Sequence, residues 1–179
     1  MGWVTRVLVM TVCSSASLAV TWLSVRLLFR WCDPIIRIAY LSSELVMIVG
    51  ACWILWTAIS AGLRWGRVIE IVLATLLTTI IPIFAYAIIL RAYLDFHDFH
   101  SPTVVETIAL IGTFLIILYH YQEWVRGMSR ELRDKGEEVG KGLALFLAGF
   151  AAMMIVATLA AAYVIHHVPT RQLVKVVRP

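Results

Sequence analysis

The sequence predicts an all-α integral membrane protein, a bundle of five transmembrane helices with a charged helical loop between the fourth and the fifth. Two observations lead to this fold class. The 179 residues are 61% apolar and have a mean hydropathy of +0.90, and a soluble domain of this length has too little interior to bury so much apolar surface. The apolar residues also form five continuous blocks, each close to the roughly 20 residues that a helix needs to cross the bilayer.

Each block is expected to be helical, because within lipid every backbone amide must find its partner inside the segment. Transmembrane β-strands alternate with a period of two, whereas these blocks are apolar throughout. No repeat or long linker divides the chain, so residues 1–179 are expected to form a single membrane domain. The predicted helices span residues 7–25, 38–61, 71–90, 104–121 and 143–165.

Five spans place the two termini on opposite sides of the membrane. Lys and Arg residues, which orient most membrane proteins, divide almost equally between the two sides. The charged loop 123–142 is the longest connection and favours a cytoplasmic N-terminus, and a basic tail follows at 169–179. The loop is expected to be a solvated helix, with a docking surface for a partner subunit as the alternative. The first block is long enough to span, so we expect a retained helix and not a cleaved signal peptide.

Glu44 is the clearest candidate functional residue, because ionisable groups inside membrane spans are costly. It lies about six residues into the second predicted helix and is expected to point into a protein interface. One interpretation is a proton or cation site, paired with Arg37 or Arg91. The alternatives are a structural group that holds two helices together, or a carboxylate in the headgroup region if the helix begins later.

The third predicted helix carries Thr75, Thr79 and Pro82 along one side. Pro82 removes a backbone hydrogen bond and therefore predicts a kink. Transporters use such breaks to line a path, although other membrane helices also tolerate proline.

The fourth predicted helix places Glu106, Thr113 and His120 at intervals of seven residues, nearly on one face. Histidine titrates near neutral pH, so this stripe is a candidate proton relay. Glu106 and His120 would stand about 21 Å apart on a straight helix, and a relay would need further groups between them. Alternatively, the stripe is simply the side that faces neighbouring helices.

Four histidines gather at one end of the predicted bundle. His97 and His100 belong to the motif FHDFH together with Asp98, and five spans bring His166 and His167 to the same side. Imidazole and carboxylate ligands suit zinc or copper, and a histidine pair at one depth suits haem. The spacing fits no metal motif, however, and these residue types also suit a short interfacial turn. Metal or haem binding is the weaker hypothesis, and no cofactor is expected.

Small residues spaced four apart allow membrane helices to approach closely. They occur in the first and the fifth predicted helix, and can be used within the bundle or face another chain. The candidate packing positions are Ser14, Ser17, Thr21, Ala144, Ala148 and Ala152.

The three cysteines show no Cys-x-x-Cys spacing, so redox chemistry is not expected. Cys13 and Cys52 fall inside predicted helices, where a thiol acts as a small apolar group. Cys32 lies in the first loop and is the one cysteine placed to react.

No phosphate-binding loop, zinc-protease motif or nucleophile elbow is found, so an enzyme is not expected. The net charge of +4 is spread over both predicted faces, unlike the basic stripe of a nucleic-acid-binding protein. We expect a non-catalytic multi-pass subunit that scaffolds a larger energy-transducing or transport complex, in contact with lipid and with other membrane subunits or further copies. The alternative is a small homo-oligomeric ion or proton channel or transporter that uses Glu44 and the helix kinked at Pro82. A metal- or haem-binding redox subunit is the weaker alternative.

Overall fold

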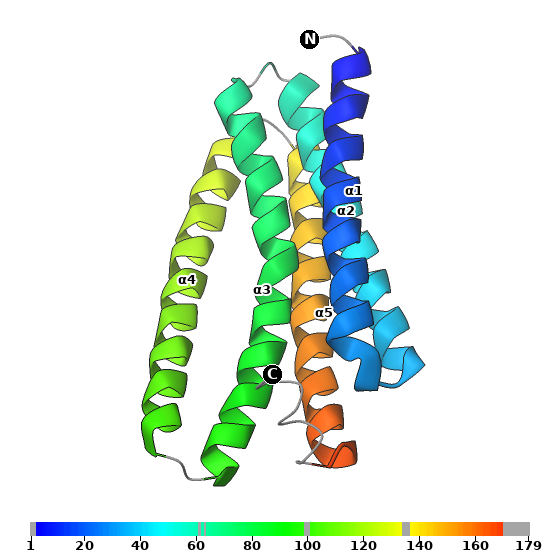
Figure 1. Ribbon diagram of the computed structural model, residues 1–179. Helices are drawn as coiled ribbons and strands as arrows, with labels where there is room; N and C mark the ends of the chain where they lie inside the picture. The colour runs from blue at the N-terminus through cyan, green and yellow to red at the C-terminus, as the bar shows by residue number, and fades with distance from the viewer. Residues whose placement is uncertain (1–2, 61, 63, 99–100, 134–136, 170–179) are drawn as a thin grey trace.

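The protein is an up-and-down bundle of five long α-helices (Figure 1). The computed structural model describes residues 3–60, 62, 64–98, 101–133 and 137–169. The first helix begins and the last helix ends at opposite ends of the bundle (Figure 1). In chain order the elements are α1 Trp3–Leu27, the 3-10 helix η1 Phe29–Trp31, α2 Pro34–Ser60, α3 Trp65–Asp98, α4 Ser101–Arg133 and α5 Glu137–His167.

All five helices are long and apolar enough to cross a membrane, with mean hydropathies between 1.3 and 2.4. The chain is therefore a multi-pass membrane protein, as the sequence predicts. Each helix extends beyond its apolar block, because charged and aromatic residues continue the helix into the interface. The described residues of the charged segment 123–142 are helical, and they belong to the last turns of α4 and the first turns of α5.

The two ends of α2 follow from local sequence signals. The Asp33 side chain accepts a hydrogen bond of 2.8 Å from the backbone N–H of Ile35, and Pro34 occupies the first helical position, where its missing N–H costs nothing. After α2, Gly62 adopts a positive φ of 72°, and its N–H donates to the carbonyl of Ile59 at 3.2 Å. A glycine in this conformation is a common helix terminator.

α2 and α5 make the most extensive helix–helix contact of the bundle. Glycines allow their backbones to approach closely. A Cβ on Gly50 would lie 2.7 Å from the carbonyl oxygen of Gly142, and a Cβ on Gly149 would lie 2.7 Å from Cα of Met47. Both distances are shorter than real Cβ contacts, so these positions require glycine.

The predicted alanine ridge of the fifth helix does not form this contact. Ala144 and Ala148 are exposed and Ala152 is only partly buried. Gly142 and Gly149 are instead the small residues of α5 that lie against α2. In lipid a small-residue ridge can occur on more than one side of a helix, and its spacing alone does not identify the side that packs.

On α1, Ser14 is partly buried and lies 3.3 Å from the Cys52 thiol of α2, whereas Ser17 and Thr21 are fully buried. Near the beginning of α1, the Arg6 guanidinium donates to the Ser60 hydroxyl at 2.9 Å. These contacts hold α1 along the length of α2.

α4 lies at the edge of the bundle, beside α3 (Figure 1). Only 11% of the residues in the apolar segment of α4 are buried inside the protein, compared with 50% for α3. Grooves of about 430 and 290 Å³ run between the two helices and are lined almost entirely by apolar side chains. In a membrane such a surface faces lipid acyl chains.

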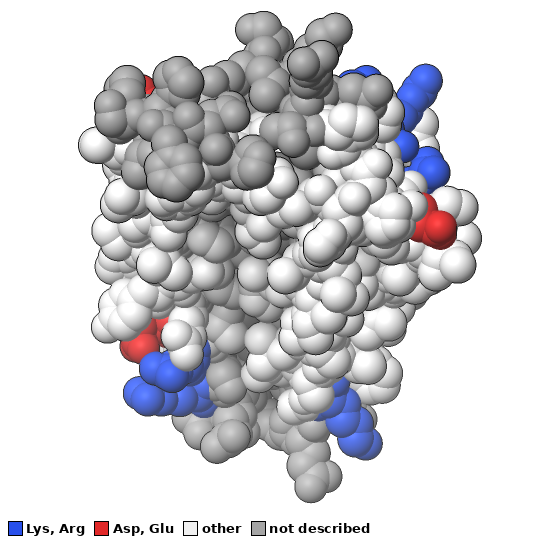
Figure 2. Space-filling model, turned by 90° about the horizontal axis from the view of Figure 1, so that it is seen from below, with Lys and Arg blue, Asp and Glu red and all other residues white. Residues whose placement is uncertain are grey.

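Figure 2 views the molecule from the end at which α1, α3 and α5 finish, and Lys and Arg lie there in separate groups at the edge. Two exposed arginines of this end cover aromatic rings. Arg26 lies over Trp22 and Arg30 over Trp31, at 5.2 and 5.0 Å from the ring centroids. Amphipathic pairs of this kind suit the headgroup region.

Candidate functional site

Glu44 of α2 is completely buried, with 0% of its surface exposed. Neither of its carboxylate oxygens accepts a hydrogen bond from a described residue, and the described part of the chain offers it no ion pair. The carboxyl therefore points into the protein and not into the headgroup region. A buried, unpaired carboxylate costs several kcal/mol, so Glu44 is stable only when it is protonated or when it binds a cation.

α1 presents small polar side chains to the bundle. Its buried residues are Cys13, Ser17 and Thr21, which follow each other at intervals of four and therefore share one face. The Thr21 hydroxyl of α1 lies on the side of the Glu44 carboxyl, although its position does not meet the geometry of a hydrogen bond. Small side chains of this kind allow membrane helices to pack closely, and partly buried apolar residues such as Val9 and Val20 complete the contact of α1 with the core.

The hydroxyls of Ser17 and Thr21 differ from nine other helical hydroxyls that the structure describes. Serine and threonine inside a helix commonly donate to the carbonyl four residues earlier. Ser17 and Thr21 are buried and form no hydrogen bond with the described residues. Their hydroxyls thus remain available to Glu44 or to a species that Glu44 binds. The nine side chains that do bond to the preceding turn are Thr11, Ser24, Ser43, Thr57, Thr75, Thr78, Thr79, Thr113 and Thr158.

α3 contributes the next polar groups. Thr75, Thr79 and Pro82, which the sequence places on one side, are all buried. The Thr75 hydroxyl donates to the carbonyl of Ile71 at 2.8 Å and also faces the Cys13 thiol of α1. Polar groups of α1 and α3 therefore meet on the side of Glu44 that is nearer the beginning of α1.

Aromatic side chains close the other side of the site. Tyr40 lies one turn before Glu44, and its hydroxyl has no hydrogen-bond partner among the described residues. The ring of Phe29 lies between those of Tyr40 and Tyr86, with centroids 4.8 and 4.6 Å away. The Tyr86 hydroxyl donates to the carbonyl of Leu28 at 2.9 Å. All three rings are buried, so they separate Glu44 from the end of the bundle at which α1 finishes.

Cys32, which the sequence indicates as the reactive thiol, is buried beneath these rings. It is 3% exposed, and its thiol lies 3.9 Å from the carbonyl oxygen of Ala160 in α5. Burial raises the pKa of Cys32 to about 11, against smaller opposite effects of Tyr86 and Arg37. The expectation of a reactive cysteine is therefore wrong, because the first connection folds back into the core.

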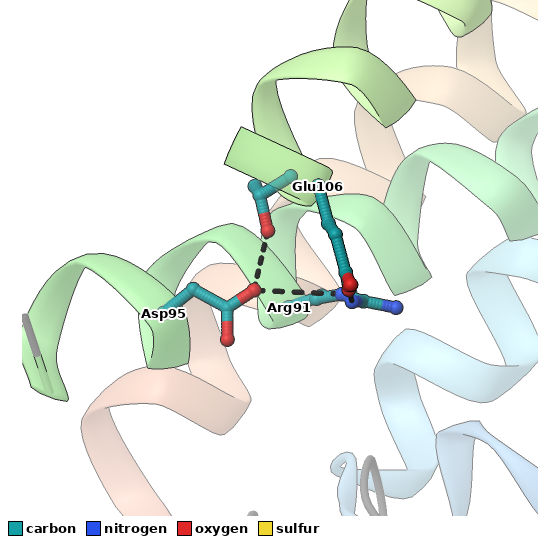
Figure 3. A network of polar contacts seen from close by, with 4 residues as sticks. Arg91, Asp95 and Glu106 are labelled. Atoms are coloured by element: carbon teal, nitrogen blue, oxygen red, sulfur yellow. Dashed lines mark hydrogen bonds and ion pairs between the residues drawn. The ribbon is translucent and has the colours of Figure 1, made fainter. Parts of the chain in front are cut away.

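Arg91, one of the two predicted partners of Glu44, binds other carboxylates instead (Figure 3). Its guanidinium donates to Glu106 of α4 at 2.9 Å and to Asp95 at 3.4 Å. The Thr107 hydroxyl donates to the same Asp95 carboxylate, which is buried. These contacts join the end of α3 to the beginning of α4. The other predicted partner, Arg37, forms no ion pair with Glu44.

The predicted relay stripe lies along the side of α4 that faces α3: Glu106 pairs with Arg91 of α3, and Thr113 lines a groove between the two helices. Glu106, Thr113 and His120 are all exposed, and Thr113 donates to its own helix at the carbonyl of Ala109. His120 lines the apolar groove between α3 and α4. The seven-residue spacing identified a shared face correctly, and this face lies toward the neighbouring helix α3. The three side chains are exposed along the α3–α4 groove, and no hydrogen bond among the described residues joins them to one another.

The predicted metal ligands are only partly within the described structure. The side chains of His97 and Asp98, and the whole of His100, lie outside it. His166 and His167 are exposed, and the His167 ring stacks on Tyr163 at a centroid distance of 4.2 Å. Among the residues that the structure describes, no group of three or more His, Cys, Asp or Glu side chains is arranged to hold a metal ion.

Sequence reasoning identified Glu44 and the neighbouring Ser17 and Thr21, but assigned the last two to helix packing. It missed Tyr40 and Phe29. The one available signal was that Tyr40 and Glu44 lie four residues apart and hence on the same face of a helix. No family model, curated protein or solved structure matches this chain, so its function has to be inferred from the site itself.

Proposed function

We propose that this membrane protein transfers a proton or a small monovalent cation across the bilayer, with Glu44 as the group that carries it. The observation that carries this proposal is the complete burial of Glu44 without a cationic partner among the described residues. Intramembrane carboxyl groups of this kind are retained at ion and proton pathways, because a purely structural role is served better by an apolar residue.

The surroundings of Glu44 support a path. On one side lie the buried small polar residues of α1 and the Thr75 hydroxyl of α3. On the other side, the Tyr40 and Tyr86 hydroxyls follow. These groups can pass a proton or coordinate a cation, whereas the contact between α2 and α5 is apolar. Phe29, packed between the two tyrosine rings, restricts access from the end of α1.

The test is ion flux in vesicles that contain the purified protein alone, measured with a pH-sensitive dye and with a cation-sensitive dye. Glu44→Gln removes the charge while keeping the size of the side chain, and it should abolish flux. Glu44→Asp keeps the carboxyl and should retain a reduced flux. The control is Glu123→Gln, which removes an exposed carboxylate of α4 that pairs with Arg126, and flux should be unchanged.

Two results would contradict the proposal. One is flux that persists in Glu44→Gln. The other is wild-type protein that elutes as a folded species and shows no flux under any imposed proton or cation gradient. Elution volume and helical content of each variant, compared with the wild type, separate a loss of transport from a loss of folding.

A scaffold subunit of a larger membrane complex is the second candidate. The observation in its favour is that Ala144 and Ala148 are exposed on α5, so a small-residue ridge remains available to another helix. Ala148→Leu should then release partner subunits on gentle detergent extraction, while Leu159→Ala, which shortens an exposed apolar side chain of the same helix, should not. Equal recovery of partners with both variants would contradict this candidate.

A further inference from the structure

We propose that the buried carboxyl of Glu44 and the α1 hydroxyls of Thr21 and Ser17 form a site for an alkali cation. Sodium is its occupant and competes there with a proton. This inference rests on the proposed function, because it names the species that binds at the same carboxyl. It begins from the two α1 hydroxyls, which a site that handles only protons does not require.

The hydroxyls are the first argument. Nine other serine and threonine side chains donate to their own helices, but Ser17 and Thr21, both 0% exposed, do not. A protonated Glu44 has a single hydrogen to donate and could satisfy one hydroxyl. A cation can draw on the oxygens of both hydroxyls and of the carboxylate at once.

The second argument is the chemistry of the ligands. Among the described residues, the buried oxygens without a hydrogen-bond partner are two of Glu44 and one each of Thr21, Ser17 and Tyr40. The other buried atoms without a partner are Nε of Arg6 and of Arg37. Oxygen ligands of this type bind hard cations and not the transition metals that prefer imidazole or thiolate. Thr21 lies beside Glu44 without forming a hydrogen bond to it, and Ser17 follows one turn away from Thr21, about 6 Å along the helix.

The third argument is charge. α5, the helix that packs most extensively on α2, has only apolar residues among its buried described side chains. Titratable groups of the adjoining turns and helices are Tyr40 on the same helix, Cys13 on α1 and Tyr86 on α3, all neutral near pH 7 in their ordinary state. The charged group on this side of α2 is Arg37, seven residues before Glu44, which forms no ion pair with it among the described residues. One carboxylate balances one monovalent cation, whereas a divalent cation would leave an uncompensated buried charge.

The test uses full-length protein in nanodiscs and a hydrophobic carbodiimide, which forms an N-acylurea with a buried protonated carboxyl. The modified residue is identified by mass spectrometry of the peptide that contains Glu44. Sodium chloride is compared with choline chloride at equal ionic strength. Sodium at about ten times its Kd leaves about one site in eleven free, so modification should slow by about tenfold. Glu44→Gln should give no modification of this peptide.

Two variants of α1 examine the hydroxyls, with a third as control. The double variant Ser17→Ala, Thr21→Val should still be modified at Glu44, but sodium should no longer protect it. Thr21→Ser keeps the hydroxyl and should keep the protection. Thr11→Val removes an exposed hydroxyl of the same helix that donates to the carbonyl of Val7, and it should behave as the wild type does.

The outcomes separate this inference from the proposed function. Protection by lithium or potassium as well as by sodium supports an alkali-cation site. Modification that no alkali chloride slows overturns it, and flux of protons that depends on Glu44 would in that case leave the proposed function standing. Protection by sodium without any Glu44-dependent flux supports the cation site and overturns transport. Protection that survives the loss of both hydroxyls overturns the assignment of Ser17 and Thr21 as ligands.

Discussion

The Arg91 guanidinium of α3 donates a hydrogen bond of 2.9 Å to the Glu106 carboxylate of α4. Beside this pair, the Thr107 hydroxyl donates to the buried Asp95 carboxylate. Together the two contacts hold α4 to the end of α3, although α4 buries little of its surface elsewhere. A helix that has few packing contacts depends strongly on polar contacts of this kind.

Thr107→Val should therefore destabilise the protein more than an exposed substitution on the same helix. The change removes one donor from a buried carboxylate, which typically costs about 1–3 kcal/mol. Thr113→Val is the matched control, because Thr113 is exposed and donates only to its own helix. Thermal unfolding in detergent, followed by circular dichroism, compares the two. Equal melting temperatures for both variants would show that the contact with Asp95 contributes nothing.

Gly50→Ala should weaken the contact between α2 and α5. Its Cβ would lie 2.7 Å from the carbonyl oxygen of Gly142, so the helices would have to separate, and overpacking of this kind costs about 1–3 kcal/mol. Gly112→Ala on α4 is the control, since a Cβ there meets nothing within 4 Å. The midpoint of unfolding in increasing denaturing detergent measures both. An unfolding midpoint of Gly50→Ala equal to that of the wild type would contradict the close contact of α2 and α5 at Gly50.

Thr78 and Tyr121 should show a measurable coupling. Their hydroxyls lie 2.5 Å apart and form the buried polar contact between α3 and the second half of α4. In a double-mutant cycle of Thr78→Val and Tyr121→Phe, the double variant should be less destabilised than the sum of the two single variants, by about 0.5–1.5 kcal/mol. Unfolding midpoints of the four proteins give the coupling. Strictly additive effects would contradict a direct hydrogen bond.

Cys32 should resist thiol reagents until the pH is high. Its pKa is raised from 9.0 to about 11 by burial, so at about pH 8 the thiolate fraction is about a hundredfold smaller than for an ordinary thiol. The neutral thiol is favoured by folding, so this contribution to stability is fully present below pH 9.0 and is lost as the pH rises toward about 11. Maleimide labelling of a Cys13→Ala, Cys52→Ala variant between about pH 7 and 11 measures how the reactivity of the Cys32 thiol changes with pH. Fast labelling at neutral pH in the folded state would contradict the burial of Cys32.

The sequence alone determined the solvent of this protein and the number of its spans. Continuous apolar blocks of helix length have one stable arrangement in lipid, and this property is local to each segment. It also identified Glu44, because a carboxyl within such a block is conspicuous whatever the tertiary structure. Helix ends were less well determined, since residues such as Trp65 and Asp98 continue a helix outside the apolar block.

The tertiary structure decided what each helix faces. A soluble helix shows its buried side by its polar side, but a helix that is apolar all round carries little such signal. For this reason the sequence did not show that Gly142 and Gly149 lie against α2 while Ala144 and Ala148 are exposed, or that Arg91 binds Glu106 instead of Glu44. The arrangement of Thr21 beside Glu44 likewise depends on α1 lying against α2, a contact between residues far apart in the sequence. Only the packed bundle determines which oxygens surround the buried carboxyl, because in lipid the choice of neighbour depends on shape and hydrogen bonding between helices and not on the hydrophobicity of either one.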